Sequence, residues 1–270
     1  MDGIRINKYL SEHGICSRRE ADRLLEAGRI LVNGIQAVPG QRIMPEDTVE
    51  LDGREVTAEE RDEPVVLAFH KPRGIVCTTS DRDRAPNIVD YIGYPVRIYP
   101  VGRLDKESTG LILLTNIGGL SDGISRAREF HEKEYIVRCR SRVTDAFLKQ
   151  MAEGVRIDVP DVKKSALSGE KQMRSVVTRK CSVCRIDEDS FRIILTQGYN
   201  RQIRRMCRAL GNPVEDLKRI RIMNIKLGAL PEGKYRILSR EETEGLMQAL
   251  QGNKKGMKGN TNEINHSAEL

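Results

Sequence analysis

Aromatic residues are scarce in this chain of 270 residues, which has no tryptophan, four phenylalanines and seven tyrosines. A broad stacking platform for single-stranded nucleic acid needs several exposed rings along one surface. The sequence does not predict such a platform, although an individual tyrosine could still stack on a single base. The length is sufficient for a sizeable hydrophobic core and for one or two domains.

Cysteine and histidine are also sparse. Six cysteines are scattered along the chain, and only Cys181 and Cys184 stand at CxxC spacing. No second Cys or His pair accompanies them at a metal-ligand spacing, and the pattern is not that of a disulfide framework. The sequence also has no P-loop, no Gly-rich dinucleotide fingerprint after a strand and no G-x-S-x-G elbow. We therefore expect neither a metal nor a cofactor.

Long apolar runs are absent as well. No stretch is apolar for long enough to span a membrane, and the segment Met1–Lys8 has no apolar run of the kind found in signal peptides. We therefore expect a cytoplasmic protein with no membrane partner.

Positive charge is in excess, with a formal net charge of +7. A basic balance favours polyanionic partners but also occurs in ordinary soluble proteins. Two stretches concentrate the charge. The first contains Arg5, Lys8, Arg18, Arg19 and Arg23. The second contains Arg201, Arg204, Arg205 and Arg208 in one predicted helix, with Lys218, Arg219, Arg221 and Lys226 close behind. Either stretch could bind the phosphates of a nucleic acid, and either could be a solvent-exposed helix face.

The pattern of the N-terminal part predicts two short helices followed by strands. Ser17 to Glu20 form a capping box, and Gly28 is a natural helix stop. Residues Ile30–Val38 predict a hairpin closed by Asn33-Gly34, and Thr48–Leu51 predict a further strand. These elements predict a small domain over residues 4–52. The charged segment 53–63 predicts a linker.

After Pro64 the pattern changes to β-rich runs interrupted by helices. The predicted strands are Val65–His70, Arg97–Val101, Leu111–Thr115, Tyr135–Cys139, Arg192–Thr196 and Ile220–Leu227. The predicted helices are Gly119–Ala127, Thr144–Ala152, Arg201–Leu210 and Arg240–Leu250. This order favours an α+β domain over residues 64–250. The polar tail 251–270 is expected to be disordered.

The segment from Gly102 to Gly110 is the strongest candidate for chemistry. It lies between two apolar runs and carries Asp105 between Arg103 and Lys106. A loop between buried strands can fix a carboxylate, and cationic neighbours keep it ionised. An ionised, poorly solvated aspartate is a competent nucleophile. From the residues alone, a surface turn with an ion pair explains the pattern equally well.

Four ordered motifs resemble those of pseudouridine synthases, in the subgroup of the small-subunit enzyme A and the large-subunit enzymes B, E and F. The catalytic motif is Gly102-Arg-Leu-Asp-Lys followed by Gly110-Leu-Ile-Leu-Leu-Thr-Asn. The others are His70-Lys-Pro-Arg-Gly, Lys133-Glu-Tyr-Ile-Val and Leu195-Thr-Gln-Gly-Tyr-Asn-Arg-Gln-Ile-Arg-Arg-Met. The N-terminal segment resembles an S4 RNA-binding domain of the αL type. The resemblance therefore implies an S4 domain and then a catalytic domain with a mixed, mainly antiparallel β-sheet flanked by helices.

The same resemblance implies roles for individual residues. Asp105 matches the nucleophile, Arg204 the arginine that pairs with it, and Tyr135 the tyrosine that stacks on the flipped base. Substrate contacts are expected from Arg103, Lys106, Leu195, Ile203, Asn200, Arg201, Gln202 and Arg205. For Leu195 and Ile203, ordinary core packing explains burial equally well. RNA binding by the S4 domain is expected from Arg5, Lys8, Arg18, Arg19 and Arg23.

The finer resemblance is to the large-subunit synthase F type, which implies a uridine near the peptidyl-transferase centre of large-subunit rRNA. A tRNA or small-subunit rRNA substrate is the alternative within the family. A non-catalytic, ribosome-associated S4 protein is the alternative outside it. Departures from the family pattern are Glu107-Ser-Thr in the aspartate loop, Ile117 after Thr-Asn, and a longer segment over 160–176, whose role stays open. A monomer is expected.

Overall fold

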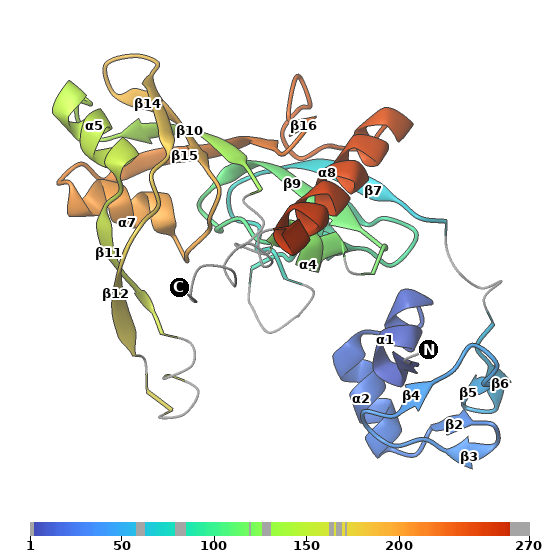
Figure 1. Cartoon of the computed structure of the whole chain (residues 1–270). Helices are drawn as coiled ribbons and strands as arrows, with labels where there is room; N and C mark the ends of the chain where they lie inside the picture. The colour runs from blue at the N-terminus through green and yellow to red at the C-terminus, as the bar shows by residue number, and fades with distance from the viewer. Residues whose placement is uncertain are drawn as a thin grey trace, which may run out of the picture.

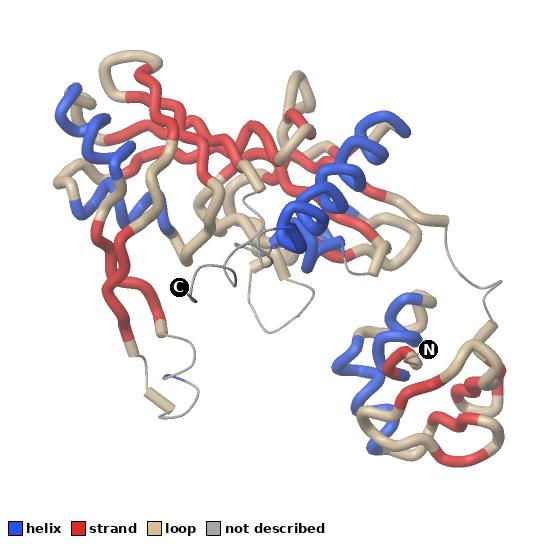
Figure 2. The backbone as a smooth tube through the Cα atoms, viewed as in Figure 1, coloured by secondary structure: helices blue, strands red, loops and turns tan. Residues whose placement is uncertain are grey.

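The computed structural model describes residues 3–57, 63–78, 85–118, 120–125, 131–161, 165, 169–170 and 172–259. Its elements form a small N-terminal α/β unit and a larger unit built on a long mixed sheet (Figures 1 and 2). The predicted order of an S4-type unit followed by a mixed-sheet domain is confirmed.

The N-terminal unit packs two helices against short strands. Its helices are α1 (Ile6–Glu12) and α2 (Arg18–Glu26). Its four-stranded sheet has the order β3-β2-β5-β6, with β2 Ile30–Val32, β3 Ile35–Gln36, β5 Val49–Leu51 and β6 Arg54–Glu55. A separate pair joins β1 (Ile4–Arg5) to β4 (Arg42–Ile43). Apolar residues of both helices and of the strands share one buried cluster, which includes Leu10, Leu25 and Ile30.

Local signals explain the ends of these elements. The Ser17 hydroxyl accepts a hydrogen bond from the Glu20 amide at 3.1 Å, as the capping pattern predicts. Asn33 and Gly34 have positive φ angles of 52° and 75°. A type I′ hairpin turn requires a positive φ at both of its central residues.

The predicted linker begins later than residue 53, because β6 pairs with β5 in register Leu51↔Arg54. Asp52 and Gly53 have φ of 54° and 78° and form a second turn of the same kind. That Asp-Gly signal was missed in the sequence. Residues 58–62 of the predicted linker lie outside the described part of the chain.

The larger unit is built on a nine-stranded sheet. The main path runs β13-β14-β10-β15-β9-β7-β17. The strands are β13 Ser182–Arg185, β14 Ser190–Leu195, β10 Lys133–Cys139, β15 Val214–Ile222, β9 Thr109–Thr115, β7 Val66–Lys71 and β17 Tyr235–Ile237. Strand β16 (Ile225–Lys226) pairs with β15, and β8 (Tyr99–Val101) pairs with β9. Only the β15–β9 pair among the described strands of this sheet is parallel, and it joins the two halves of the sheet.

Helices cover this sheet over three apolar clusters. The helices are α3 Ile88–Ile92, α4 Leu120–Ser125, α5 Asp145–Glu153, α7 Gln202–Ala209 and α8 Arg240–Gly259. One cluster joins α5 and α7 to β10, β14 and β15, a second joins α4 and α8 to β7 and β9, and a third joins α3 to the other face of β7 and β9. Strands β7 and β9 are buried on both faces, which explains their continuous apolar runs.

Two segments differ from the sequence prediction. The long segment around 160–176 is framed by a hairpin of β11 (Arg156–Pro160) and β12 (Met173–Val177), which projects from the sheet in Figure 1. Helix α8 continues to Gly259, past the expected start of the tail at residue 251. No proline interrupts that backbone, so nothing forces the helix to stop at Leu250. Residues 260–270 lie outside the described part.

Candidate active site

The candidate nucleophile lies on the loop that joins β8 to β9. These strands are antiparallel neighbours with Val101 opposite Leu113, so the loop 102–108 connects two ends of one buried ladder. Asp105 is half-buried in the middle of the loop, and its carbonyl oxygen accepts a hydrogen bond from the Ser108 amide at 3.0 Å. The loop therefore presents one carboxylate from a tight turn whose two ends are fixed by the sheet.

The buried side chain of Lys71 hydrogen-bonds to the backbone of this loop. The Lys71 side chain has no exposed surface. Its ammonium donates to the carbonyl oxygens of Pro72 at 2.7 Å and Ile75 at 2.9 Å, and more weakly to that of Lys106 at 3.4 Å. The Gly74 amide donates to the same Lys106 oxygen at 2.9 Å. The turn after β7 is thus tied directly to the residue that follows Asp105.

Two further anchors hold the residues before Asp105. The Cys77 thiol donates to the Leu104 carbonyl at 3.2 Å, and the Leu104 amide donates back to the sulfur at 3.4 Å. The buried Arg219 guanidinium of β15 donates to the carbonyl oxygens of Leu111 at 2.6 Å and Arg103 at 3.3 Å. Backbone contacts on both sides of Asp105 therefore restrict the loop, which is what a preorganised nucleophile requires.

Arg204 contacts the catalytic loop through its backbone and a hydroxyl. Its guanidinium donates to the Glu107 carbonyl at 3.3 Å and to the Ser108 hydroxyl at 3.2 Å. Burial lowers the pKa of Arg204 and the neighbouring Arg201 lowers it further, while the negative charges of Asp105 and Glu107 act in the opposite direction. Arg204 therefore lies in the field of Asp105.

The expected direct pair between Arg204 and Asp105 is not formed in this geometry. Within the described part of the chain, no ion pair joins their charged atoms. Arg204 instead binds the loop on the far side of Asp105.

Tyr135 lies two strands away from the loop. It stands on β10 opposite Arg219 of β15, and Arg219 in turn stands opposite Gly110 of β9. Adjacent strands are spaced about 4.8 Å apart, so this register brings the tyrosine backbone within about 10 Å of β9 just after the aspartate loop. The Tyr135 ring is partly buried against the cluster under α7. The phenol is thus placed along the same part of the sheet as Asp105 and Arg204.

Of the eight predicted substrate contacts, four are exposed, one is half-buried and three are buried. Arg103, Lys106 and Asn200 are exposed, whereas the Gln202 side chain is buried. The side-chain oxygen Oε1 of Gln202 accepts a hydrogen bond from the Tyr199 backbone amide at 3.0 Å, so this side chain closes the turn before α7. Its observed contacts favour a structural role over the expected substrate contact, since the turn already uses its amide group.

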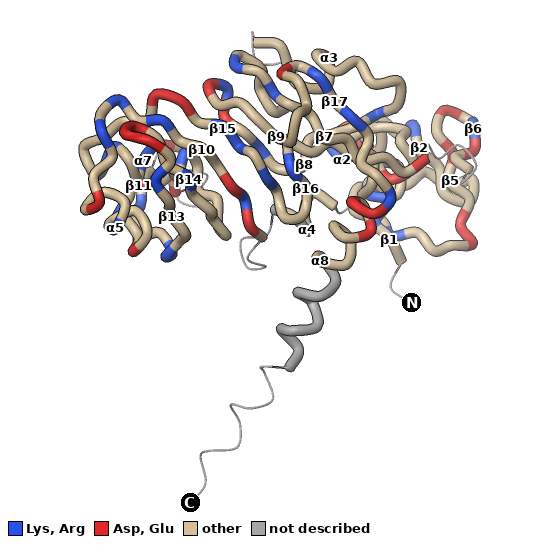
Figure 3. Tube along the Cα trace, turned by 90° about the horizontal axis from the view of Figure 1, so that it is seen from above, with Lys and Arg blue, Asp and Glu red and all other residues tan. Residues whose placement is uncertain are grey.

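Leu195 and Ile203 also have little surface to offer a substrate. They are 3% and 4% exposed and belong to the core cluster that seats α7. Packing is the role that their position supports, because the apolar side of α7 must face the sheet. None of the basic residues of α7, whose positions along the trace are blue in Figure 3, is among the buried residues of the helix.

Arg201 and Arg205 have distinct partners around α7. Arg201 forms an ion pair with Glu107 of the catalytic loop at 2.7 Å. Arg205 donates to the carbonyl oxygens of Asn200 at 2.9 Å and of Asp158 at 2.7 Å. Arg205 therefore fixes α7 to β11, while Arg201 contacts the catalytic loop.

The basic residues of the N-terminal unit are mostly exposed. Arg5, Arg18, Arg19 and Arg23 are exposed, and Lys8 is half-buried. Lys8 lies 3.6 Å from Glu12, and Arg23 lies 3.0 Å from Glu20, so acids of the same helices partly offset both charges.

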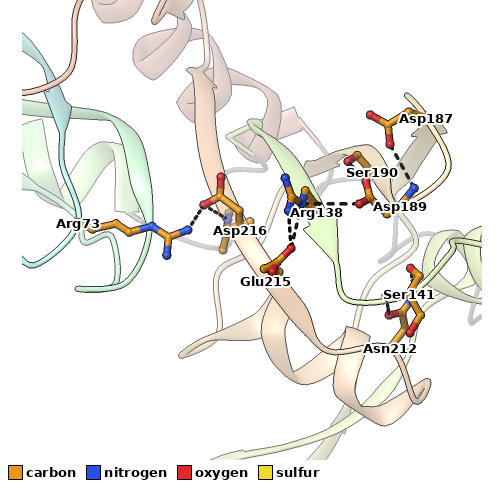
Figure 4. Close-up of polar contacts among 10 residues, drawn as sticks. Arg73, Arg138, Ser141, Asp187, Asp189, Ser190, Asn212, Glu215 and Asp216 are labelled. Carbon is orange, nitrogen blue, oxygen red and sulfur yellow. Dashed lines mark hydrogen bonds and ion pairs between the residues drawn. The ribbon is translucent and has the colours of Figure 1, made fainter.

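Two ion pairs involve β15, which borders the seam between the two halves of the sheet, and one of them crosses that seam (Figure 4). Arg73, in the turn after β7, reaches Asp216 of β15 at 2.6 Å, and Arg138 of β10 contacts Glu215 at 2.8 Å. These side chains are substantially exposed, so each pair stabilises the fold only weakly. The Arg73 pair nevertheless joins segments 143 residues apart beside the catalytic loop.

Sequence reasoning missed three residues that anchor the loop. Lys71 stands inside the His70-Lys-Pro-Arg-Gly motif, where a lysine in an otherwise apolar strand was an available signal. Arg219 was noticed only as part of a basic stretch, although its side chain is buried. Cys77 carried no signal, because its bond to Leu104 depends on tertiary contact alone.

Lys133, at the start of β10, is a half-buried cation near the site. Burial, reinforced by the positive charge of Arg219, lowers the pKa of Lys133 from 10.5 to about 8. The folded protein therefore binds fewer protons than the unfolded chain between pH 8 and pH 10.5, and the stability of the protein rises with pH across this window. Below pH 8 both states are charged, and the full cost of burying the ammonium remains.

We expect Lys133→Met to raise the free energy of unfolding at pH 7 by about 1–3 kcal/mol. The gain should shrink as the pH rises from 8 towards 10, because the wild-type lysine is then neutral when folded. Urea unfolding at pH 7 and at pH 9.5 measures the difference. Lys149→Met, at an exposed position of α5, is the matched control. A loss of stability at pH 7, or a gain independent of pH, would contradict the assignment.

Among the residues that the structure describes, no group of three or more His, Cys, Asp or Glu side chains could hold a metal ion. Within the same residues, no helix is both long and apolar enough to cross a membrane. The groups that the structure places at and beside the loop are a carboxylate, cations and a phenol.

Comparison with known proteins identifies the family of this chain. The model of the RNA pseudouridylate synthase family matches residues 65–209, which include the aspartate loop, Tyr135 and Arg204. This chain belongs to the RNA pseudouridylate synthase family. The model of the S4 domain matches residues 4–49. The family predicted from the four motifs and the N-terminal domain is confirmed.

Two curated relatives and one solved structure align with most of this chain. The chain is 45% identical over 248 residues to the dual-specificity RNA pseudouridine synthase RluF of Salmonella typhi, and the alignment covers 92% of this chain and 80% of that protein. It is 30% identical over 247 residues to ribosomal large subunit pseudouridine synthase B of Bacillus subtilis, covering 90% and 95%. A crystal structure of a pseudouridylate synthase matches with a TM-score of 0.61 and 29% identity, covering 90% of this chain and 99% of that one.

Proposed function

We propose that this synthase converts uridine to pseudouridine at a specific position of large-subunit ribosomal RNA, close to the peptidyl-transferase centre. The observation that carries the proposal is the half-buried Asp105 on a loop whose backbone is fixed from β7, β15 and α7. Supporting it, relatives of high coverage are named as large-subunit or dual-specificity synthases.

In the proposed reaction, the bond between N1 of uracil and C1′ of ribose breaks, the base rotates, and C5 bonds to C1′. The C5 proton leaves and N1 gains a proton, so no oxidant or group donor is needed. Asp105 acts as the nucleophile toward the sugar or the ring. A carboxylate next to an electron-poor C1′ has a physical parallel in glycoside hydrolysis.

The other residues position the substrate. We assign Tyr135 to stacking on the base, since a phenol is a weak base near neutral pH. Arg204 holds the loop that carries Asp105, through Glu107 and Ser108. The target nucleotide has to leave its stack to reach the carboxylate, which implies base flipping. The exposed Arg103 and Lys106 are assigned to phosphate contacts.

The proposal also covers the RNA contacts of the S4 domain, a second substrate, the oligomeric state and the cellular compartment. The exposed S4 arginines, namely Arg5, Arg18, Arg19 and Arg23, with the half-buried Lys8, bind the RNA outside the target nucleotide. A tRNA substrate is a second candidate, and the word dual-specificity in the name of the Salmonella relative indicates that that protein has more than one substrate. We further propose that the protein acts as a monomer in the cytoplasm.

Tritium release from RNA that carries uridine labelled at C5 tests the function directly. We expect release from a large-subunit rRNA transcript, with smaller or no release from small-subunit rRNA. Mapping pseudouridines in a strain that lacks the protein then identifies the position. Binding of the transcript without any release, from tRNA as well as rRNA, would favour a non-catalytic S4 protein and overturn the proposal.

A further inference from the structure

A groove lies between α7 and β11, next to the catalytic loop. It encloses a cavity of about 310 Å³. It is lined by Arg156, Ile157, Asp158, Arg201, Arg204, Arg205, Arg208 and Ala209. Five of these eight residues are arginines and one is acidic, so the groove is strongly positive.

The walls of this groove are held together by a defined contact. Arg205 of α7 donates to the Asp158 carbonyl of β11 at 2.7 Å, and the apolar side of α7 packs in the same cluster as Ile157. The spacing between α7 and β11 is therefore set by the fold. Basic residues line the groove from both elements, with Arg156 on β11 and Arg204, Arg205 and Arg208 on α7.

Two of the arginines have no charge partner. Arg156 on β11 and Arg208 in the last turn of α7 are exposed, and in the described part of the chain neither forms an ion pair. Arg208 gains a little from its place at a helix C-terminus, and Asp158, two residues along β11 from Arg156, is the one acid that lines the groove. Like charges at close range repel, and a bound polyanion would relieve that cost at both walls.

The groove is continuous with the catalytic loop. Arg204 lines the groove and also donates to Glu107 and Ser108 of the loop, and Arg201 lines it while pairing with Glu107. Helix α7 is eight residues long, so its axis runs for about 12 Å away from the loop. A strand that enters the site at Asp105 can therefore continue along α7 without crossing an uncharged surface.

We infer that this groove binds the phosphodiester backbone of the RNA strand that flanks the target uridine. Arg156 and Arg208 contact its phosphates from opposite walls. The inference rests on the proposed function, because it takes the RNA substrate as the polyanion. It assigns to β11, at the base of the projecting hairpin, a role as one wall of the substrate path. No such role follows from the sequence, in which Arg156 stands alone.

Binding of a large-subunit rRNA transcript at a series of salt concentrations tests this inference. The variant is Arg156→Gln with Arg208→Gln. Each lost phosphate contact should reduce the slope of log affinity against log salt by about 0.7–0.9, so the double variant should lose about 1.4–1.8. Its affinity should fall by about tenfold at physiological salt. The conservative pair Arg156→Lys and Arg208→Lys keeps the charges and should restore most of the slope.

The matched control is Lys149→Gln with Lys180→Gln, which removes the same charge from two exposed residues outside the groove. A slope equal for the control and for the arginine variant would overturn the inference, as would an affinity loss without any change in slope. Both readouts are binding measurements, so they remain decisive if the wild-type enzyme releases no tritium. Failure of the groove and failure of the proposed reaction are thus distinguishable.

Discussion

Replacing Asp105 with asparagine is expected to abolish isomerisation. The amide is nearly isosteric with the carboxylate but is not a nucleophile, so the rate of tritium release should fall by at least about 10³-fold. The loop should keep its shape, because its anchors at Arg103, Leu104 and Lys106 are backbone atoms. Binding of the rRNA transcript should therefore stay within about threefold of wild type.

Asp216→Asn is the matched control, since it makes the same chemical change near the site. Asp216 pairs with Arg73 across the seam, and both side chains are substantially exposed, at 44% and 55%. Loss of that pair should change stability by no more than about 1 kcal/mol and leave turnover near that of wild type. If Asp105→Asn retained turnover comparable to this control, the nucleophile would have to be another residue.

Replacing Gly110 with alanine should produce the largest loss of stability. Gly110 has a φ of +106°, and a Cβ atom there would lie 2.2 Å from the Arg219 carbonyl oxygen and 2.6 Å from its amide nitrogen. These are backbone atoms of β15 at its parallel pairing with β9, so neither strand can yield without breaking the ladder. We expect a loss of at least about 3 kcal/mol.

Gly211→Ala separates conformational strain from the clash. Gly211 also has a positive φ of +77°, but no neighbouring atom lies within 4 Å of its added Cβ. That variant should lose about 1 kcal/mol. Urea unfolding measures both, and recovery of soluble protein serves where Gly110→Ala does not fold. Equal losses for the two variants would show that the close approach to Arg219 is not limiting.

Local chemistry was readable from the sequence where a few adjacent residues decide the structure. The Ser17 cap, the Asn33-Gly34 turn and the apolar runs of β7 and β9 were all predicted, because each depends on neighbours in the chain. The Asp52-Gly53 turn carried the same signal and was overlooked. The exposed strand β17 and the short β13 were missed because they have little apolar pattern.

The active-site residues were identified through motifs, while their contacts were not. Sequence placed Asp105, Tyr135 and Arg204 in one family pattern but implied a direct pair between Arg204 and Asp105. In the fold, Arg204 binds the Glu107 carbonyl and the Ser108 hydroxyl instead. Gln202 and Ile203, next to Arg204 in the chain, turned inward because the helix presents its sides at 100° per residue to a buried sheet.

The sequence by itself determined the family, the two-part order of the chain and the identity of the candidate nucleophile. Those depend on residue types in fixed local order. Only the tertiary structure decided how the nucleophile is held. The anchors Lys71, Cys77 and Arg219 reach the loop of Asp105 from 28 to 114 residues away along the chain. Their contacts depend on which strands become neighbours in the sheet, and above all on the parallel pairing of β15 with β9, which local propensity does not encode.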